Sequence, residues 1–114
     1  MTQTIKIGDK DVTFKANGAT LYYYRDKFNR DLFADFAKIT TGEVTEETFE
    51  ILQHLAFIMA RQADNTIPDD LMEWLDTFDV FPFNDVAVPI ITLWQKSNIT
   101  NVEPKKSQSR PKDK

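Results

Sequence analysis

Cysteine is absent from the 114-residue sequence, histidine occurs once and glycine only three times. Without cysteine there is no disulfide scaffold, no thiol nucleophile and no cysteine-containing zinc site. Three scattered glycines provide no phosphate-cradling loop. The longest apolar runs are only a few residues, and Met1 to Lys15 lacks the apolar block of a signal peptide. We therefore expect a soluble, intracellular protein that has no membrane partner.

The sequence is well supplied with apolar and aromatic side chains. Hydrophobic residues make up 41% of the chain and aromatic residues 12%, with nine Phe, three Tyr and two Trp. This supply is sufficient for one core, whereas two independent cores in 114 residues would each be marginal. The composition therefore predicts a single folded domain over residues 1–102.

The charges are distributed unevenly. Residues 103–114 hold five basic and two acidic residues, a net charge of +3, so the overall charge of −4 leaves −7 on residues 1–102. The same segment has no apolar side chain to offset the entropy of ordering, which predicts a disordered basic tail. An acidic body lacks the basic face that duplex binding needs to release counterions, so nucleic acid is not expected as a partner.

The N-terminal pattern is typical of a β-hairpin over about residues 4–15. Polar and apolar residues alternate on both sides of Gly8-Asp9-Lys10, and Ile5 and Ile7 share a face with Val12 and Phe14. Two strands alone are unstable in water. We therefore expect the hairpin to lie on helices or to pair with another chain.

Apolar residues that recur every three or four positions predict four to five helices over about residues 19–96. Asp31 and Thr45 are the expected N-caps of the second and third helices, and the first two helices are either separate or one bent helix. Pro89 is expected near the first turn of the last helix, or at a kink. The fold class is therefore α+β and predominantly α-helical. The first expected helix begins near Ala19 or Thr20. The second follows Asp31, turns Leu32, Phe33 and Phe36 inward and ends at Thr40-Thr41-Gly42. The remaining helices are expected from just after Thr45 to about Ala63, from Leu71 to about Phe78 and from about Asn84 to about Lys96.

No residues are expected to be catalytic, to hold a cofactor or to bind a metal. His54 is the only histidine, and we interpret it as a partly exposed residue on the surface of the third helix. The carboxylates around the fourth helix lack the spacing and the turn glycine of a calcium loop. We interpret them as a solvated acidic face whose first two members support the helix N-terminus. This face comprises Asp69, Asp70, Glu73 and Asp76. We therefore expect that the protein is not an enzyme.

Two aromatic segments are candidates for partner contact. A helix spreads Tyr22, Tyr23 and Tyr24 over about 200°, so a small core cannot bury all three. Phe81 and Phe83 flank a proline in a predicted turn, and exposed aromatic side chains mark contact surfaces. The alternative is that the second segment, together with Phe78, closes the core between the last two helices. The candidate partner-binding residues are Tyr22, Tyr23, Phe81 and Phe83.

The second half of the chain carries a run of short motifs. They are AFIMARQAD over 56–64, IPD over 67–69, EWLDTF over 73–78, Phe83, and IITLW over 90–94. Together with the ribbon IKIGDKDVTF near the start, this pattern resembles the tail assembly chaperones of long-tailed bacteriophages and of prophages of Gram-positive bacteria. The resemblance covers most of the first hundred residues and involves core and turn residues.

The resemblance implies a role without catalysis in the cytoplasm of the bacterial host. Such a chaperone transiently coats the tape measure protein through apolar and aromatic contacts and helps to recruit tail-tube subunits. It also self-associates into a ring or spiral and is not expected in the mature virion. The family commonly makes a longer product by ribosomal frameshifting, and the codons of Lys105 and Lys106 can form an A-rich slippery site.

The alternative is a small helical adaptor or regulatory protein that binds one partner helix. In that case the basic tail over residues 103–114 could contact nucleic acid. Binding through the tail would weaken steeply with added salt, whereas apolar chaperoning would not. Salt dependence therefore separates the two hypotheses.

Overall fold

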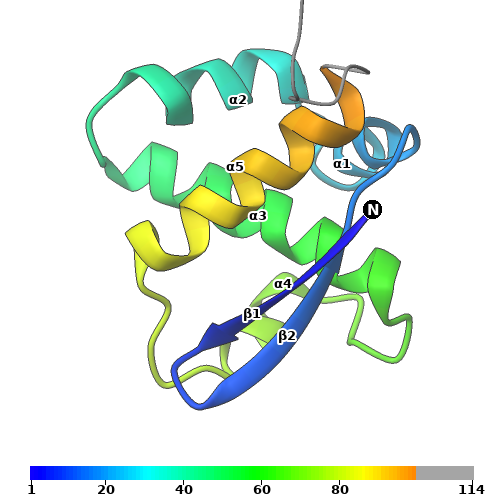
Figure 1. Ribbon diagram of the computed structural model, residues 1–114, viewed down its shortest axis with the longest axis vertical. Helices are drawn as coiled ribbons and strands as arrows, with labels where there is room; N and C mark the ends of the chain where they lie inside the picture. The colour runs from blue at the N-terminus through cyan, green and yellow to red at the C-terminus, as the bar shows by residue number, and fades with distance from the viewer. Residues whose placement is uncertain (100–114) are drawn as a thin grey trace, which may run out of the picture.

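The computed structural model describes residues 1–99, and the predicted tail with Lys105 and Lys106 lies outside this range (Figure 1). The fold is α+β and predominantly helical, as predicted, with a hairpin followed by five helices. None of the helices in the described range combines the length and apolarity needed to span a bilayer. The elements are β1 (Thr2–Ile7), β2 (Lys10–Lys15), α1 (Thr20–Phe28), α2 (Leu32–Thr41), α3 (Glu46–Ala63), α4 (Leu71–Leu75) and α5 (Phe83–Asn98).

The hairpin pairs β1 with β2 in antiparallel register, from Thr2 opposite Lys15 to Ile7 opposite Lys10. It begins two residues earlier than predicted because Thr2 and Gln3 continue the pairing. Gly8 opens the two-residue turn at a φ of +63°, a conformation that glycine adopts without steric cost. The four predicted inward residues, Ile5, Ile7, Val12 and Phe14, are all buried. Through this face the hairpin packs against α3 and α5.

The first two helices are separate. Asn29 ends α1 in the left-handed region, with a φ of 56°. The Asp31 carboxylate then caps α2 by accepting hydrogen bonds from the backbone N–H groups of Phe33 and Ala34, as predicted. The prediction that Phe33 faces the core is wrong, because its side chain is 52% exposed while Leu32 is buried. The half-exposed Phe33 ring lies 5.7 Å from the Trp94 ring, in a T-shaped arrangement.

The central element is α3, whose predicted start after Thr45 and end at Ala63 are confirmed. Thr45 and Thr48 form a capping box in which each hydroxyl accepts a hydrogen bond from the other residue's backbone N–H. Leu52, Leu55 and Phe57 are fully buried. Since α3 packs against β2, α1, α2, α4 and α5, it positions every other part of the molecule (Figure 1).

The last two helices differ in detail from the prediction. α4 ends at Leu75 rather than at about Phe78, because the N–H and the hydroxyl of Thr77 both bond to the Trp74 carbonyl and tighten the turn. α5 begins one residue earlier than expected, at Phe83, and continues to Asn98. Pro89 lies inside α5, beyond its first turn, so the prediction of a first-turn position is wrong.

Candidate partner-binding site

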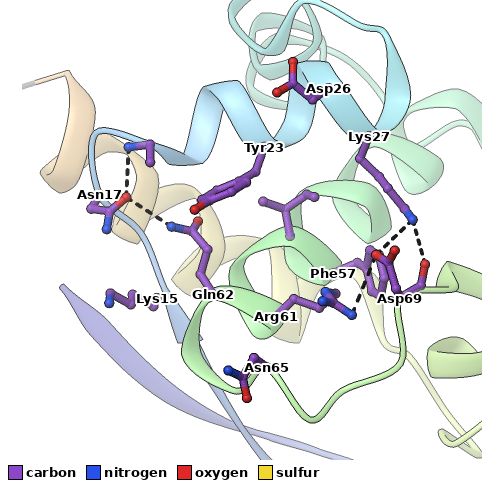
Figure 2. Close-up of a pocket in the computed structure, with 12 residues that line it drawn as sticks. Lys15, Asn17, Tyr23, Asp26, Lys27, Phe57, Arg61, Gln62, Asn65 and Asp69 are labelled. Carbon is purple, nitrogen blue, oxygen red and sulfur yellow. Dashed lines mark hydrogen bonds and ion pairs between the residues drawn. The ribbon is translucent and has the colours of Figure 1, made fainter.

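A pocket of about 590 Å³ opens on the side of the molecule where β2 leads into α1 (Figure 2). The second half of α3 forms its floor, α1 forms one wall and the loop before α4 forms another. Cations, amides and carboxylates surround a small apolar floor, so the pocket suits a side chain or chain segment of mixed character. It is lined by Lys15, Asn17, Ala19, Tyr23, Asp26, Lys27, Phe57, Ile58, Arg61, Gln62, Asn65 and Asp69.

An amide network holds the corner between β2 and α1 onto α3. The Asn17 side-chain oxygen accepts hydrogen bonds from the Ala19 N–H at 2.9 Å and from Gln62 Nε2 at 3.1 Å (Figure 2). The Thr20 hydroxyl, which is buried, donates to Gln62 Oε1 at 2.7 Å. Because these groups satisfy one another, this wall of the pocket is rigid before any partner arrives.

An ion-pair cluster holds the opposite wall. Lys27 Nζ lies 3.0 Å from Asp69 Oδ1 and donates to the Asp69 backbone carbonyl at 2.6 Å. Arg61 approaches the same carboxylate at 3.7 Å and donates to the Ile67 carbonyl at 2.7 Å. The hydrogen bond from Lys27 lowers the pKa of the exposed Asp69 carboxyl. These contacts tie the loop before α4 to α1 and α3.

The predicted acidic face is therefore divided in the structure. Asp69 pairs with Lys27 and Arg61, and its side chain stays 73% exposed, as expected of a solvated face. Asp70 occupies the N-cap position of α4, where its charge lies at the helix N-terminus as predicted, although its side chain makes no capping hydrogen bond. Within residues 1–99 no three His, Asp or Glu side chains are grouped in a way that could hold a metal ion.

The tyrosine triplet is divided between the surface and the core. Tyr24 is fully buried, whereas Tyr22 and Tyr23 are 52% and 54% exposed. Tyr23 forms part of the pocket wall, and the Arg25 guanidinium lies over the Tyr22 ring at 5.0 Å. The exposed surface of α1 thus presents two aromatic rings, of which Tyr23 lies at the open pocket (Figure 2).

The second predicted pair, Phe81 and Phe83, is half-buried and packs against the core. The Phe49 ring on α3 lies 6.2 Å from Phe81 and 5.7 Å from Phe83, and Trp74 lies 6.1 Å from Phe81. These contacts fit the alternative that the aromatic turn closes the core between α4 and α5. In Figure 1 this turn lies far from α1, so the structure does not bring the two predicted pairs together.

His54 is half-buried on α3, which agrees with the predicted partly exposed position, and its ring lies against α1. Its ring stacks on Phe28 at a centroid distance of 4.1 Å and an interplanar angle of 8°. The buried Nδ1 atom has no hydrogen-bond partner among residues 1–99. Burial holds the pKa of His54 below its usual 6.5, against the opposing attraction of Glu50.

We expect the protein to lose stability as the pH falls from 7 toward 5, because the unfolded chain then takes up a proton at His54 before the folded chain does. The full loss is reached once the pH is below the pKa of His54 in the folded protein. Chemical denaturation at a series of pH values measures this slope, and His54 is the only histidine that contributes to it. His54→Phe keeps a ring for stacking and should flatten the slope, so a slope of unchanged size in this variant would contradict the assignment.

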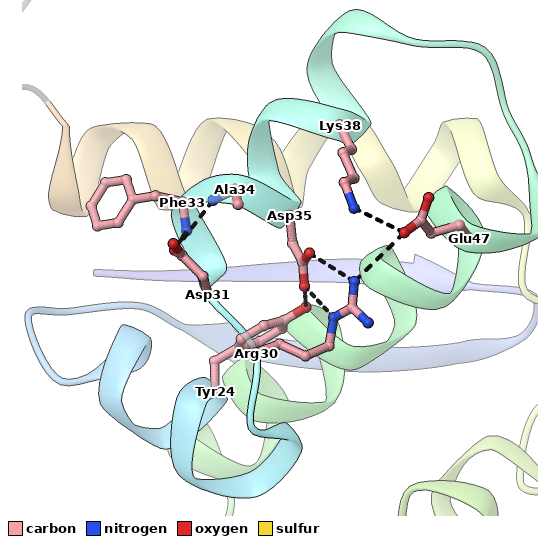
Figure 3. A network of polar contacts seen from close by, with 8 residues as sticks. All are labelled: Tyr24, Arg30, Asp31, Phe33, Ala34, Asp35, Lys38 and Glu47. Atoms are coloured by element: carbon pink, nitrogen blue, oxygen red, sulfur yellow. Dashed lines mark hydrogen bonds and ion pairs between the residues drawn. The ribbon is translucent and has the colours of Figure 1, made fainter.

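A second polar cluster joins α1, α2 and α3 (Figure 3). The buried Asp35 carboxylate accepts hydrogen bonds from the Tyr24 hydroxyl at 2.7 Å and from Arg30 Nε and an Arg30 terminal nitrogen at 2.6 and 2.9 Å. Arg30 also reaches Glu47, which binds Lys38 at 2.9 Å. Because the buried Asp35 carboxylate and Tyr24 hydroxyl are both paired, we interpret the cluster as a structural lock that joins the three helices.

Comparison with protein-family models, with curated proteins and with solved structures finds no match for this chain. The resemblance to tail assembly chaperones therefore stays a hypothesis. Sequence reasoning identified only Tyr23 and Asp69 among the residues that line the pocket, and Asp69 in a different role. No local signal points to Lys15, Arg61 or Gln62, since the packing of β2 and α1 on α3 brings them to one pocket.

Proposed function

We propose that this protein is a tail assembly chaperone of a long-tailed bacteriophage or prophage. It binds the tape measure protein transiently in the cytoplasm of the bacterial host, many copies per partner, and helps to recruit tail-tube subunits without catalysis. The observation that carries the proposal is a pair of exposed, consecutive tyrosines on α1, Tyr22 and Tyr23, of which Tyr23 lines the open pocket. The sequence motifs over residues 56–94 supply the family hypothesis.

Tyrosine at the rim of a mixed pocket suits reversible binding of an amphipathic helix. Its ring contributes a large apolar contact area, and its hydroxyl stays hydrated or bonds to the partner. The pocket next to Tyr23 has room for a bulky side chain, and the paired charges of Lys27 and Asp69 provide a polar rim. The amide and ion-pair networks hold these groups in place before binding, which reduces the ordering cost of each contact.

The test is co-expression with the tape measure protein encoded in the same genome, followed by size-exclusion chromatography with light scattering. We expect a soluble complex with many copies of this chain per partner. Replacing both Tyr22 and Tyr23 by Ser should weaken binding by about 10- to 100-fold, as expected for aromatic residues at the centre of an interface. Phe33→Ser is the matched control, because Phe33 is equally exposed, at 52%, but lies on α2.

Three results would contradict the proposal. If the tape measure protein aggregates whether or not this chain is present, the proposed chaperone activity is wrong. If Phe33→Ser weakens binding as much as the tyrosine variant does, the binding surface is not specific to α1. A complex with one copy per partner helix, or one that dissociates steeply with added salt, supports the adaptor hypothesis instead.

A further inference from the structure

The sheet formed within residues 1–99 has two strands, so each strand has one edge without a neighbouring strand in this range. The hairpin has six consecutive residue pairs, without a bulge or a proline. Bulges and prolines are among the features by which natural proteins protect such edges, because an unprotected edge can pair with another chain. Either edge of the hairpin could therefore accept a strand from another chain, and the two edges differ in charge.

The hydrogen-bond pattern shows which backbone groups point outward. Met1 and Ala16 exchange both of their N–H to carbonyl bonds, at 2.9 and 3.2 Å. Since bonded and non-bonded pairs alternate along an antiparallel ladder, the pairs Thr2–Lys15, Thr4–Thr13 and Lys6–Asp11 are the non-bonded ones. The 2.8 Å contact between the Thr4 and Thr13 hydroxyls fits the closer approach of such a pair.

The outward backbone groups of β2 therefore belong to Asp11, Thr13 and Lys15. Among residues 1–99, no backbone or side-chain group forms a hydrogen bond with the N–H or the carbonyl of any of these three residues across this edge. The Asp11 side chain is 71% exposed, and no carboxylate in the described range lies within ion-pair distance of Lys15. The β2 edge thus offers three donors, three acceptors and two charges of opposite sign.

We propose that two copies of this protein pair through their β2 edges in antiparallel orientation, with the two-fold axis at Thr13. This register places Thr13 opposite its counterpart and Asp11 of each copy opposite Lys15 of the other. The three outward pairs exchange six backbone hydrogen bonds, and the two hairpins become one four-stranded sheet. Two cross-strand ion pairs flank the axis on the exposed face of that sheet.

Charge distinguishes the β2 edge from the β1 edge. Pairing two β1 edges about Thr4 would place Lys6 of each copy opposite the uncharged Thr2, which provides no charge complementarity. Lys15 has no carboxylate partner among residues 1–99, whereas Lys6 already lies 3.7 Å from Asp11. The contact is small, so we expect a weak dimer, with a dissociation constant on the order of micromolar to millimolar.

The inference does not depend on the proposed function, because β2 self-pairing can be measured without any tape measure protein. Sedimentation velocity of the full chain, from about 10 μM to about 1 mM, should show the mass rising from 13.2 kDa toward twice that value. Amide hydrogen exchange should slow at Thr13 as the concentration rises. The outward amide of Thr4 on the β1 edge is the matched control and should not change.

A charge swap tests the register. Asp11→Lys or Lys15→Asp alone places like charges opposite each other at both ion-pair positions and should weaken the dimer by about tenfold or more. The double variant D11K/K15D should restore it. Circular dichroism checks that each variant is folded. Lys15→Asp decides the outcome if Asp11→Lys unfolds, because Lys15 forms no ion pair within the described part of the chain.

Several results would overturn the inference. A monomer at every concentration, or a double variant as weak as the single ones, removes the β2 pairing. Concentration-dependent protection at Thr4 in place of Thr13 moves the contact to the β1 edge. Species larger than a dimer that are lost on Lys6→Glu show head-to-tail pairing of β1 with β2, which is an open arrangement rather than a two-fold one.

Discussion

Replacing Asp35 by Ala is expected to lower the free energy of unfolding by about 3–5 kcal/mol. The Asp35 carboxylate is buried and accepts hydrogen bonds from Tyr24 on α1 and from Arg30 in the loop between α1 and α2 (Figure 3). Without it, Arg30 loses two charge-assisted hydrogen bonds and keeps the longer contact with Glu47. The buried Tyr24 hydroxyl loses its acceptor, and leaving that hydroxyl unpaired adds to the cost. Urea or thermal denaturation followed by circular dichroism measures the change.

Glu47→Ala is the matched control for this prediction. Glu47 belongs to the same cluster and contacts both Arg30 and Lys38, but its side chain is 54% exposed. Solvent screens an exposed pair, so its removal should cost about 1 kcal/mol or less. Similar losses in the two variants would show that burial of the Asp35 pair does not matter and would contradict the prediction.

The same lock predicts a second pH dependence, at lower pH than that of His54. Burial by itself raises the pKa of the Asp35 carboxyl, but the hydrogen bonds from Arg30 and Tyr24 outweigh it, and the net pKa lies below 3.8. A depressed folded pKa contributes stability that is complete above 3.8 and is lost as the pH falls through the folded value. In Asp35→Ala, the free energy of unfolding should depend less steeply on pH below 3.8 than in the unmodified protein, because this carboxyl no longer takes up a proton.

Replacing Trp94 by Ala is expected to cost about 3–5 kcal/mol as well, for a different reason. Trp94 is fully buried on α5, and its ring lies 5.7 Å from Phe33 and 6.2 Å from Phe36 on α2. Truncation therefore leaves a cavity between these helices in addition to losing the burial of the indole. Denaturation followed by the fluorescence of Trp74, the other tryptophan, measures the change without an added probe.

Trp94→Phe separates packing from polarity. The Trp94 indole N–H is buried and has no hydrogen-bond partner among residues 1–99. Phe keeps most of the ring and removes this unpaired donor, so the net cost should be below about 1.5 kcal/mol. A loss in Trp94→Phe as large as in Trp94→Ala would indicate that the indole N–H has a partner that is essential to the core.

Much of the fold could be predicted because its determinants are local. The alternation around Gly8 predicted the hairpin and its buried face, and Asp31 and Thr45 marked two helix starts. The errors occurred where side-chain and backbone bonding overrode the pattern. The Thr77 contacts with Trp74 ended α4 early, and α5 tolerated Pro89 past its first turn. Periodicity carries no information about such contacts, since it reports only which face of an element is apolar.

The candidate site was predicted only in part. Three consecutive tyrosines on one helix required at least one exposed ring, whatever the partner elements were. Which rings are exposed, and that Tyr23 lies at a pocket, depends on where α1 rests on α3. Phe81 and Phe83 carry the same composition signal as Tyr22 and Tyr23, yet Phe49 and Trp74 cover them. Exposure is a property of the packed whole, so composition alone could not separate the two pairs.

The sequence by itself determined the fold class, the inward face of the hairpin, two helix caps and the absence of thiol and disulfide chemistry. These features follow from covalent composition and from interactions within a few residues. The tertiary structure alone decided that Lys15, Lys27 and Asp69 meet at one pocket and that Asp35 is locked by Tyr24 and Arg30. The reason is that these groups come from different elements, and only the packing of those elements on α3 fixes the distances between them.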